Sequence, residues 1–392
     1  MKHYIKIVVI YLMRILSHVF YIFPVKKNRI LFSSFEGGNY GCSPKYIFEY
    51  MYENYGDSYE YVWCINDKNK IPQKYNVLSC SYLTLLYLFY LLTSKVIISN
   101  QPIIPIISKK KEQLFINTCH GGGAYKKGGI NATFVSKSDK LCMTYMKNLR
   151  AGMTNYVISS CHTYTNIFST EIEYNIEKSK FLPIGMPRND LFFTSEKEEL
   201  RNKICNQLGI DESKKIILYA PTYRGSYRQT THININLDIQ LLCDTVQQSF
   251  KETPIVLYRH HIADKGLIFN DITNVVDVSD YQDMQELLFI TDIFITDYSS
   301  SVWDFSLTGK PGFLFTPDLQ EYQKETNFHT PIELWPYPYA LTTKELCTNI
   351  LKYDANEALQ KIKAHHFLLG SYEKGSATEE ICKIIKSHLI SK

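Results

Sequence analysis

The stretch TDIFITDYSSSVWDF, residues 291–305, predicts a short buried strand, a polar turn and the first turn of a helix. Apolar residues fill the strand, and three serines, Ser299 to Ser301, follow at the point where the helix begins. In open parallel sheets, ligands bind outside the carboxyl ends of the strands. This one stretch therefore indicates an α/β fold and also the edge of the sheet where chemistry is expected.

The same strand-and-helix alternation recurs on both sides of this stretch. Strand-like segments in the first half are NRILFSSF, YEYVWCI, KVIISN, QLFINTCH, TNYVISS and KFLPIG, and those in the second half are KKIILYAPT, TPIVLYRHH, TNVVDVS, TDIFITD and PGFLFT. Helix-like segments lie between them, for example PKYIFEYMYE, SYLTLLYLFYLLTS and YQDMQELLF. Two such series predict an α/β fold with two Rossmann-like domains facing a central cleft.

Length and composition agree with two packed globular domains. The chain has 392 residues, of which 45% are hydrophobic and 21% charged. The expected division is an amphipathic helix at residues 1–25, an N-terminal Rossmann-like domain at 26–195, and a C-terminal Rossmann-like domain with C-terminal helices at 196–392. The net charge of +4 is too small to indicate a nucleic-acid partner.

The ten cysteines show neither a Cys-x-x-Cys pair nor a regular spacing. This pattern predicts no zinc site and no disulfide framework, and it favours a reducing cytoplasm. No cofactor is indicated, although a loosely held Mg²⁺ on a bound diphosphate stays open.

The N-terminal segment 5–23 is strongly apolar but carries Lys6, Arg14 and His18. At 100° per residue the helix has a polar side with Lys2, His3, Lys6, Arg14, Ser17 and His18, and an apolar side with Ile5, Val8, Leu12, Ile15, Leu16 and Val19. A basic amphipathic helix of this kind suits a membrane surface. No small-residue cleavage site follows, which argues against a signal peptide. A span and a helix docked on the domain behind it both stay open.

Reactive side chains collect at the predicted strand ends. His120 ends one strand, Pro221 and Thr222 end another, Arg259 and His261 end a third, and Ser299, Ser300 and Asp304 follow the stretch quoted above. Exposed N–H groups and hydroxyls at a helix start suit an anion. Each residue also has a plainer interpretation, since a single serine is often only an N-cap and a single histidine often only bonds within the core.

Two other enzyme classes use a glycine-rich run like the one after His120. Lipase-type hydrolases build an oxyanion hole from His-Gly-Gly-Gly, but they need Gly-x-Ser-x-Gly, which no serine of this chain has. A P-loop needs Lys and Ser/Thr after its second glycine, and here Gly129 and Ile130 occupy those positions. The residues present therefore argue against both a lipase-type hydrolase and a P-loop enzyme.

Six segments together resemble the CDP-glycerol glycerophosphotransferase family, which includes teichoic-acid primases and polymerases and their capsule-pathway relatives. In chain order they are ILFSSFEGGNYGCSPKYIFEYM, CHGGGAYKK, GMPRND, YAPTYR, YRHH and ITDYSSSVWDFSLTGKPGFLFTPDLQEY. The resemblance runs from about Asn28 to the C-terminus. It implies a GT-B fold and transfer of a polyol phosphate from a CDP-linked donor to a hydroxyl, with release of CMP.

The resemblance also implies roles for individual residues. His120 would take the proton of the acceptor hydroxyl, and Arg259 and His261 would stabilise charge on the transferred phosphoryl group. Ser299, Ser300 and Asp304 would hold the nucleotide end of the donor, and Pro221 and Thr222 would line the nucleotide pocket. Gly121, Gly122 and Gly123 would let backbone approach the substrate, Arg188 would reach in from the domain junction, and Asp283 would be a weaker nucleotide contact.

The chain departs from the family pattern at one point that bears on its substrates. The polymerases usually have Trp-His-Gly-Thr-Pro, whereas here Cys119 replaces Trp and Gly122 and Gly123 replace Thr-Pro. The implied partners are a CDP-activated polyol, a glycan or polyprenyl-linked acceptor, and the cytoplasmic face of the membrane. Four points stay open. They are whether the donor carries glycerol or ribitol phosphate, whether the product is wall teichoic acid or capsule, whether one unit or many are added, and what the oligomeric state is. The alternative function is a GT-B glycosyltransferase that uses a nucleotide-sugar donor.

Overall fold

The computed structural model describes residues 2–127, 136–222, 225–226, 229–230, 237–260 and 274–390. The chain divides into two compact units. Unit 1 consists of Met1–Gly122, Gly128–Phe193 and Gly370–Lys392, and unit 2 consists of Gly123–Lys127 and Thr194–Leu369. The C-terminal segment thus belongs to unit 1, whereas the division expected from sequence assigned it to the second domain.

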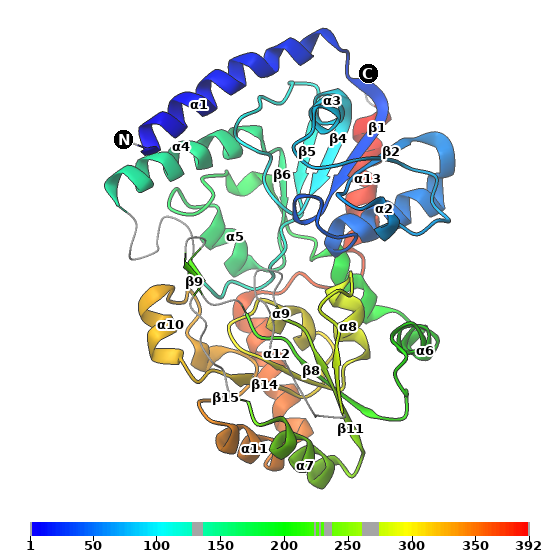
Figure 1. The fold of residues 1–392 in the computed structure, drawn as a ribbon, viewed down its shortest axis with the longest axis vertical. Helices are drawn as coiled ribbons and strands as arrows, with labels where there is room; N and C mark the ends of the chain where they lie inside the picture. The colour runs from blue at the N-terminus through cyan, green and yellow to red at the C-terminus, as the bar shows by residue number, and fades with distance from the viewer. Residues whose placement is uncertain are drawn as a thin grey trace. The chain divides into compact units, whose positions relative to one another are not determined.

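Unit 1 contains a parallel seven-stranded sheet in the order β3-β2-β1-β4-β5-β6-β7 (Figure 1). Its strands are β1 (Lys26–Ser33), β2 (Glu60–Cys64), β3 (Leu78–Cys80), β4 (Ser94–Ser99), β5 (Leu114–Asn117), β6 (Tyr156–Ile158) and β7 (Phe181–Leu182). Its helices are α1 (Lys2–Ser17), α2 (Cys42–Tyr55), α3 (Leu85–Thr93), α4 (Lys137–Met153), α5 (His162–Phe168) and α13 (Ala377–Ile390).

Alternate residues of these strands pack on opposite faces of the sheet. Leu31 of β1 joins a core cluster with Leu91 of α3, whereas its neighbour Phe32 contacts Phe48 of α2, with ring centroids 5.4 Å apart. Phe32 is fully buried, as expected for a parallel sheet covered on both faces. The doubly covered sheet provides a rigid edge from which the loops after β1, β4 and β5 project.

Unit 2 contains a parallel six-stranded sheet in the order β12-β11-β8-β13-β14-β15. Its strands are β8 (Lys215–Tyr219), β11 (Pro254–Tyr258), β12 (Val275–Asp277), β13 (Ile293–Thr296), β14 (Gly312–Phe315) and β15 (Tyr339–Ala340), with a separate pair β9 (Gly225–Ser226) and β10 (Gln229–Thr230). Its helices are α6 (Lys197–Leu208), α7 (Ile239–Phe250), α8 (Met284–Ile290), α9 (Ser301–Ser306), α10 (Leu319–Glu325), α11 (Thr343–Leu351) and α12 (Ala355–Leu369). Two Rossmann-like sheets confirm the predicted α/β fold class.

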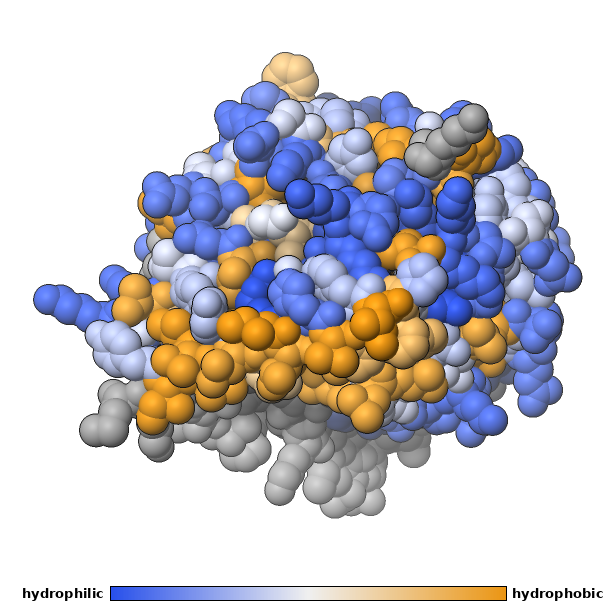
Figure 2. Space-filling view, turned by 90° about the horizontal axis from the view of Figure 1, so that it is seen from above, coloured by the Kyte–Doolittle hydropathy of each residue, from blue (hydrophilic) through white to orange (hydrophobic). Residues whose placement is uncertain are grey.

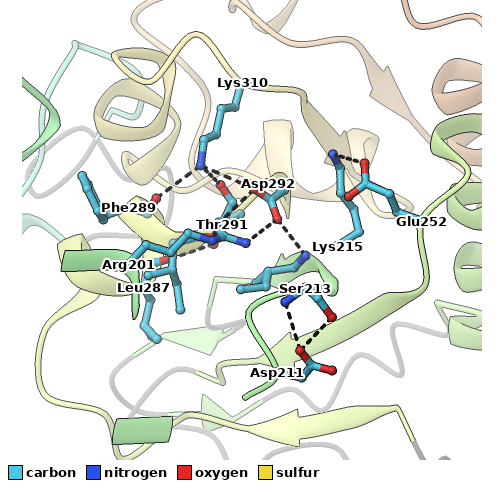
Figure 3. A network of polar contacts seen from close by, with 12 residues as sticks. Arg201, Asp211, Ser213, Lys215, Glu252, Leu287, Phe289, Thr291, Asp292 and Lys310 are labelled. Atoms are coloured by element: carbon cyan, nitrogen blue, oxygen red, sulfur yellow. Dashed lines mark hydrogen bonds and ion pairs between the residues drawn. The ribbon is translucent and has the colours of Figure 1, made fainter. Parts of the chain in front are cut away.

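A polar network fastens the amino ends of β8 and β13 (Figure 3). Asp292 accepts hydrogen bonds from the Arg201 guanidinium and from the backbone N–H of Ile216, both at 3.0 Å. Lys310 lies 3.6 Å from the same carboxylate and donates to the carbonyl of Thr291 at 2.6 Å. This end of the sheet is opposite to the carboxyl ends of the strands, so the network supports the fold and leaves the other edge to ligands.

Helix α1 packs on unit 1 through its polar side. Arg14 donates to the carbonyls of Pro105 and Ile107 and, at 3.3 Å, to the hydroxyl of Ser108. Near the start of the helix, His3 lies 2.9 Å from the carboxylate of Asp139 in α4. The predicted N-terminal helix is confirmed, and it faces the protein with His3, Arg14 and Ser17 of its polar side together with the buried Ile10.

The apolar side of α1 is consequently exposed. Val8, Leu12 and Leu16 each keep more than half of their surface open to solvent, at 55%, 52% and 60%. Figure 2 shows apolar residues gathered in a band on this face of the molecule. Among the described residues, the helical stretch His3–Ile22 alone is long and apolar enough to cross a membrane, and 11% of its most apolar window is buried.

The predicted strands were placed correctly apart from their ends. The short edge strands β3 and β15 were not predicted, and neither were helices α4, α5 and α10. Helix α4 is the longest of these, and its mixed sequence KSDKLCMTYMKNLRAGM buries few apolar side chains. Its start depends on a capping box at Ser136 and Asp139, a local signal that hydrophobic periodicity does not reveal.

Candidate active site

His120 follows β5 on a sharply turned loop in unit 1. The side-chain oxygen of Asn117 accepts a hydrogen bond from the N–H of Cys119 at 3.0 Å, and Cys119 has a φ of +55°. A left-handed conformation at a residue other than glycine is strained and persists where the surroundings impose it. The turn carries His120 out of the core, and its side chain is exposed.

The imidazole of His120 is oriented by a backbone carbonyl. Its Nδ1 lies 3.3 Å from the carbonyl oxygen of Asn100, the first residue after β4. Since a carbonyl can only accept, this contact favours hydrogen on Nδ1 and leaves Nε2 as the basic nitrogen. The arrangement suits a general base that accepts a proton through Nε2.

The loop after β1 completes this side of the site. Asn100, almost fully buried, donates from its amide to the hydroxyl of Ser34 at 3.2 Å and accepts from the N–H of Phe35 at 2.9 Å. Phe35 and Glu36 both have positive φ, at 48° and 54°. The ring of Phe35 lies 5.9 Å from that of His120. Asn100 therefore joins the loops after β1, β4 and β5.

The three glycines after His120 lie on both sides of the division between units. Gly121 and Gly122 belong to unit 1, and Gly123 belongs to unit 2. Gly123 has a φ of +66°, and a Cβ there would lie 2.6 Å from the ring of Tyr125. Only glycine fits this position, because Tyr125 folds back against it.

The segment 123–127 is bonded to the rest of unit 2. Thr330 donates its hydroxyl to the carbonyl of Ala124 at 2.7 Å, and the N–H of His329 donates to the carbonyl of Tyr125 at 2.7 Å. The hydroxyl of Tyr125 lies 2.8 Å from Nε2 of His365. Residues Ala124 and Tyr125, shortly after His120, are therefore held by contacts within unit 2.

Arg188 lies beneath the His120 loop and is almost fully buried. It is in the 3-10 segment Pro187–Phe193, and its guanidinium lies 3.9 Å from the sulfur of Cys42. The Cys42 thiol in turn lies 3.8 Å from the carbonyl of Cys119. This position connects Arg188 with the residue before His120, which suits support of the loop.

In unit 2, Asp297 connects the ends of β8 and β13, which the sequence pattern had indicated as two separate parts of the site. Its carboxylate accepts from the N–H of Thr222 at 2.9 and 3.0 Å and from the Thr222 hydroxyl at 2.8 Å. Thr222 and Pro221 are partly exposed, while Asp297 is buried. Asp297 was quoted in the sequence motif but was not chosen as a site residue, since its partner lies 75 residues away.

Arg259 directly follows β11, and its half-buried guanidinium donates to the carbonyl of Tyr281 at 2.8 Å. Burial lowers the pKa of Arg259, and the nearby Asp283 carboxylate opposes that shift. Asp283 itself is buried and caps α8, where its side chain accepts from the N–H of Gln285 at 3.0 Å. In this structure Asp283 therefore stabilises the start of α8.

The serine run after β13 presents partly exposed hydroxyls at the start of α9. The Ser299 hydroxyl accepts from the hydroxyl of Ser301 at 2.7 Å, and Ser300 is the N-cap residue without a side-chain cap bond. Asp304 is buried and accepts from the side-chain amide of Gln285 at 3.0 Å. Ser299 and Ser300 are thus accessible to solvent, whereas Asp304 links α9 to α8.

His261 lies outside the described residues, so the structure says nothing about it. Within unit 2 the structure brings Pro221 and Thr222 together with the turn before Ser299 through Asp297. Within unit 1 it brings Arg188 to the loop of His120 through Cys42. In the described part of the chain, no three His, Cys, Asp or Glu side chains gather as metal ligands.

Two histidines of α12, the buried His365 and the partly buried His366, were missed at the sequence level. Nδ1 of His365 lies 2.7 Å from the carbonyl of Leu334, so its Nε2 accepts from Tyr125. Nε2 of His366 lies 2.8 Å from the hydroxyl of Ser306, in the last turn of α9. The pair His-His gave no periodic signal, and its partners are distant in sequence.

These histidines predict a loss of stability in acid. Burial lowers the pKa of both His365 and His366 to about 4, while an unfolded histidine titrates near about 6.5. The unfolded chain therefore binds more protons below pH ~6.5, and each histidine removes up to about 1.4 kcal/mol of unfolding free energy per pH unit between ~6.5 and ~4. Above that window the two groups have no effect.

Thermal unfolding followed by circular dichroism from pH 8 to pH 4.5 measures this slope. We expect His365→Gln to flatten the acid side of the curve, and the exposed His162 provides the matched control as His162→Gln. Equal slopes for His365→Gln and the native chain would rule out a neutral buried His365.

Comparison with known proteins supplies the family. The profile of the family described as CDP-Glycerol:Poly(glycerophosphate) glycerophosphotransferase matches residues 15–387. The chain belongs to this glycerophosphotransferase family. The predicted family, GT-B-like fold class and transferase activity are confirmed, and the match favours a glycerophosphotransferase over the nucleotide-sugar alternative.

The glycerophosphotransferase is similar to characterised teichoic-acid enzymes. It is 30% identical over 390 residues to the teichoic acid poly(glycerol phosphate) polymerase of Bacillus spizizenii, covering 94% of this chain and 95% of the relative. It is 29% identical to the teichoic acid glycerol-phosphate transferase of Staphylococcus aureus, covering 92% and 93%. It spans 51% of a longer polymerase from Staphylococcus epidermidis.

Among solved structures, the glycerophosphotransferase resembles the wall teichoic acid polymerase TagF. A form of TagF with a histidine-to-alanine substitution superposes with a TM-score of 0.82 at 26% identity, covering 99% of this chain and 96% of TagF. Another form of TagF, with a histidine-to-asparagine substitution, was soaked with CDPG.

Proposed function

We propose that this glycerophosphotransferase transfers glycerol phosphate from CDP-glycerol to a terminal hydroxyl of a lipid-linked teichoic-acid chain. The acceptor oxygen forms a bond to the phosphorus that carries the glycerol. The bond from that phosphorus to the bridging oxygen of the diphosphate breaks, and CMP leaves with the bridging oxygen. Phosphoryl transfer of this kind depends on positioning and on compensation of charge.

His120 is the proposed base that takes the proton of the acceptor hydroxyl. Its exposed imidazole and the contact of Nδ1 with the Asn100 carbonyl support this role, because they present Nε2 as the acceptor. Gly121, Gly122 and Gly123 provide the close backbone approach after it. Arg188, buried under the same loop, is proposed to hold that loop in place.

Unit 2 is proposed to bind the donor, and unit 1 the acceptor. Ser299, Ser300 and the N–H groups of the turn are the proposed contacts to the diphosphate, with Pro221 and Thr222 along the nucleotide. Arg259 and His261 are proposed to stabilise charge on the transferred phosphoryl group. Asp283 and Asp304 would act mainly by holding α8 and α9.

The apolar side of α1 is proposed to lie on the cytoplasmic face of the membrane, where a lipid-linked acceptor is available. In water this side would expose Val8, Leu12 and Leu16 at a cost in free energy that lipid contact removes. The polar side is already used by the contacts of Arg14 and His3 with unit 1. Exposed Lys26 and Lys27 flank the helix and favour an anionic surface.

The match of the family over residues 15–387 is the observation that carries this proposal. The test incubates the purified chain with a lipid-linked glycerol-phosphate acceptor and CDP-glycerol, CDP-ribitol or UDP-N-acetylglucosamine, and measures the released nucleotide by chromatography. We expect acceptor-dependent CMP from CDP-glycerol. Release of UDP, or no CMP from either CDP-polyol, would overturn the proposal.

A further inference from the structure

The carboxyl ends of β8 and β13 lie at the topological switch point of the sheet in unit 2. The strand order β12-β11-β8-β13-β14-β15 means that the chain runs outward from β8 through β11 to β12. It then returns to the other side of β8 as β13 and continues in the opposite direction. In open α/β sheets ligands bind outside the carboxyl ends of the strands at this reversal. Thr222, three residues after β8, and Asp297, directly after β13, are at these two ends.

Asp297 takes up both hydrogen-bond donors of Thr222. Its buried carboxylate accepts from the Thr222 backbone N–H at 2.9 and 3.0 Å and from the Thr222 hydroxyl at 2.8 Å. The N–H of Tyr298 donates to the same carboxylate at 2.6 Å. Because both carboxylate oxygens already accept from backbone N–H groups, the hydrogen between the two side chains belongs to the threonine hydroxyl.

The residues on either side of Asp297 fix its orientation. The hydroxyl of Thr296 donates to the carbonyl of Ala220 at 2.7 Å, and the hydroxyl of Tyr298 donates to the carboxylate of Asp318 at 3.0 Å. All five of these residues are buried. The carboxylate of Asp297 is therefore held toward the loop after β8, and Thr222 keeps one direction of hydrogen bonding.

Pro221 and Thr222 consequently present hydrogen-bond acceptors at the switch point. Pro221 has no N–H, and both donors of Thr222 are directed at Asp297. A threonine hydroxyl has one O–H and two lone pairs, so a further bond at Oγ of Thr222 can only be an accepted one. Both residues are partly exposed. Their complement in a ligand is an N–H or O–H group, whereas an ionised diphosphate offers only acceptors.

Ser299, two residues beyond Asp297, has the opposite polarity. Its partly exposed hydroxyl accepts from the N–H of Ser301 at 3.2 Å and from the hydroxyl of Ser301 at 2.7 Å. These two bonds use the lone pairs of the Ser299 oxygen, so its own O–H is the group that it offers to a ligand. An acceptor at Thr222 and a donor at Ser299 match a nucleoside diphosphate, whose nucleoside carries N–H and O–H groups and whose diphosphate carries acceptor oxygens.

We propose that Oγ of Thr222 accepts a hydrogen bond from the nucleoside of the donor substrate, and that Asp297 is the positioning residue that fixes this hydroxyl as an acceptor. Two parts of cytidine have the required chemistry, the exocyclic amine of the base and the ribose hydroxyls. The amine would make the site selective, because uracil has a carbonyl in its place. This inference rests on the proposed function and names the group of the donor that Thr222 recognises.

The test measures Kd by calorimetric titration, without acceptor, for CDP-glycerol, UDP-glycerol and the dideoxyribose analogue of CDP-glycerol. Thr222→Val keeps the branched shape and removes Oγ. We expect it to weaken binding of CDP-glycerol by about 5- to 100-fold, since a donor group of the ligand is left without its acceptor. Thr222→Ser, which retains the hydroxyl, should keep most of the affinity.

The two analogues identify the recognised group. If it is the amine, Thr222→Val weakens the dideoxyribose analogue as much as CDP-glycerol and leaves UDP-glycerol unchanged or more tightly bound. If it is a ribose hydroxyl, Thr222→Val weakens CDP-glycerol and UDP-glycerol equally and leaves the dideoxyribose analogue unchanged. Either pattern supports the proposal.

Asp297→Asn tests the positioning role. The amide cannot accept from both donors of Thr222 in the native way, so the threonine hydroxyl can turn and donate instead. We expect the pattern of Kd changes that Thr222→Val gives and, if the amine is the partner, tighter binding of UDP-glycerol, because a donating hydroxyl suits uracil. A residue that only stabilised the loop would lower Tm and weaken all three ligands equally.

The matched control is Thr348→Val in α11, where the exposed hydroxyl donates to the carbonyl of Lys344 at 2.8 Å. It should bind all three ligands like the native chain.

Two results would overturn the proposal. One is an unchanged Kd for CDP-glycerol in Thr222→Val. The other is an equal loss of affinity for all three ligands, which would assign Thr222 to the glycerol moiety or to the structure of the loop. Failure of the native chain to bind CDP-glycerol or to release CMP from it would instead reject the proposed function itself.

Discussion

With His120 replaced by alanine, CMP release from CDP-glycerol is expected to fall by about 10²- to 10⁴-fold in kcat, the usual contribution of a positioned general base. The reason is that the substitution removes Nε2, the proposed proton acceptor, while the loops that Asn100 joins keep their contacts. The measurement is nucleotide release at saturating donor and acceptor. His162→Ala, an exposed histidine of α5 in the same unit, is the matched control.

The pH profile distinguishes a base from a residue that merely shapes the loop. In the native chain the rate should decline on the acid side, where a protonated imidazole cannot accept the hydroxyl proton. The residual activity of His120→Ala should lack that limb. An unchanged kcat, or an acid limb that survives the substitution, would contradict the assignment of the base.

Changing Val8, Leu12 and Leu16 together to glutamine is expected to reduce binding to lipid vesicles by about 10³-fold or more. Each buried apolar side chain of this size contributes about 1.5–3 kcal/mol, and each factor of ten corresponds to ~1.4 kcal/mol. Glutamine adds no charge, so the result is not confused by repulsion from anionic lipid. Flotation with phosphatidylglycerol vesicles measures the bound fraction.

The control for this variant replaces three exposed leucines of unit 2, Leu341, Leu351 and Leu359, with glutamine. It changes the same number of apolar side chains away from α1 and should float like the native chain. Equal flotation of both triple variants would show that the apolar side of α1 does not bind the bilayer. Turnover of a soluble acceptor should be unaffected in both.

The sequence alone was sufficient to predict features that follow a local, repeating pattern of residues. Apolar runs located the strands, and strand ends located His120, Thr222, Arg259 and Ser299. The amphipathic pattern located α1, although the side that faces the protein depends on the acceptors in loop 105–108, which lie about 90 residues from Arg14.

Sequence was insufficient where a role arises from contacts between distant segments. Asp297 became recognisable only when β13 paired with β8 and brought it to Thr222. Asn100 likewise shows its importance through Ser34 and Phe35 in the loop after β1 and through His120 in the loop after β5.

The return of the chain's last helix to unit 1 has a consequence for how the protein is made. The backbone N–H groups of Ala377 and Thr378 donate to the carboxylate of Asp190, and the thiol of Cys382 lies 3.9 Å from the carbonyl of Ile47. During synthesis, unit 2 is complete in the nascent chain before unit 1, whose first strands emerge earliest. Unit 1, which begins first, is therefore completed only after α13 has been synthesised.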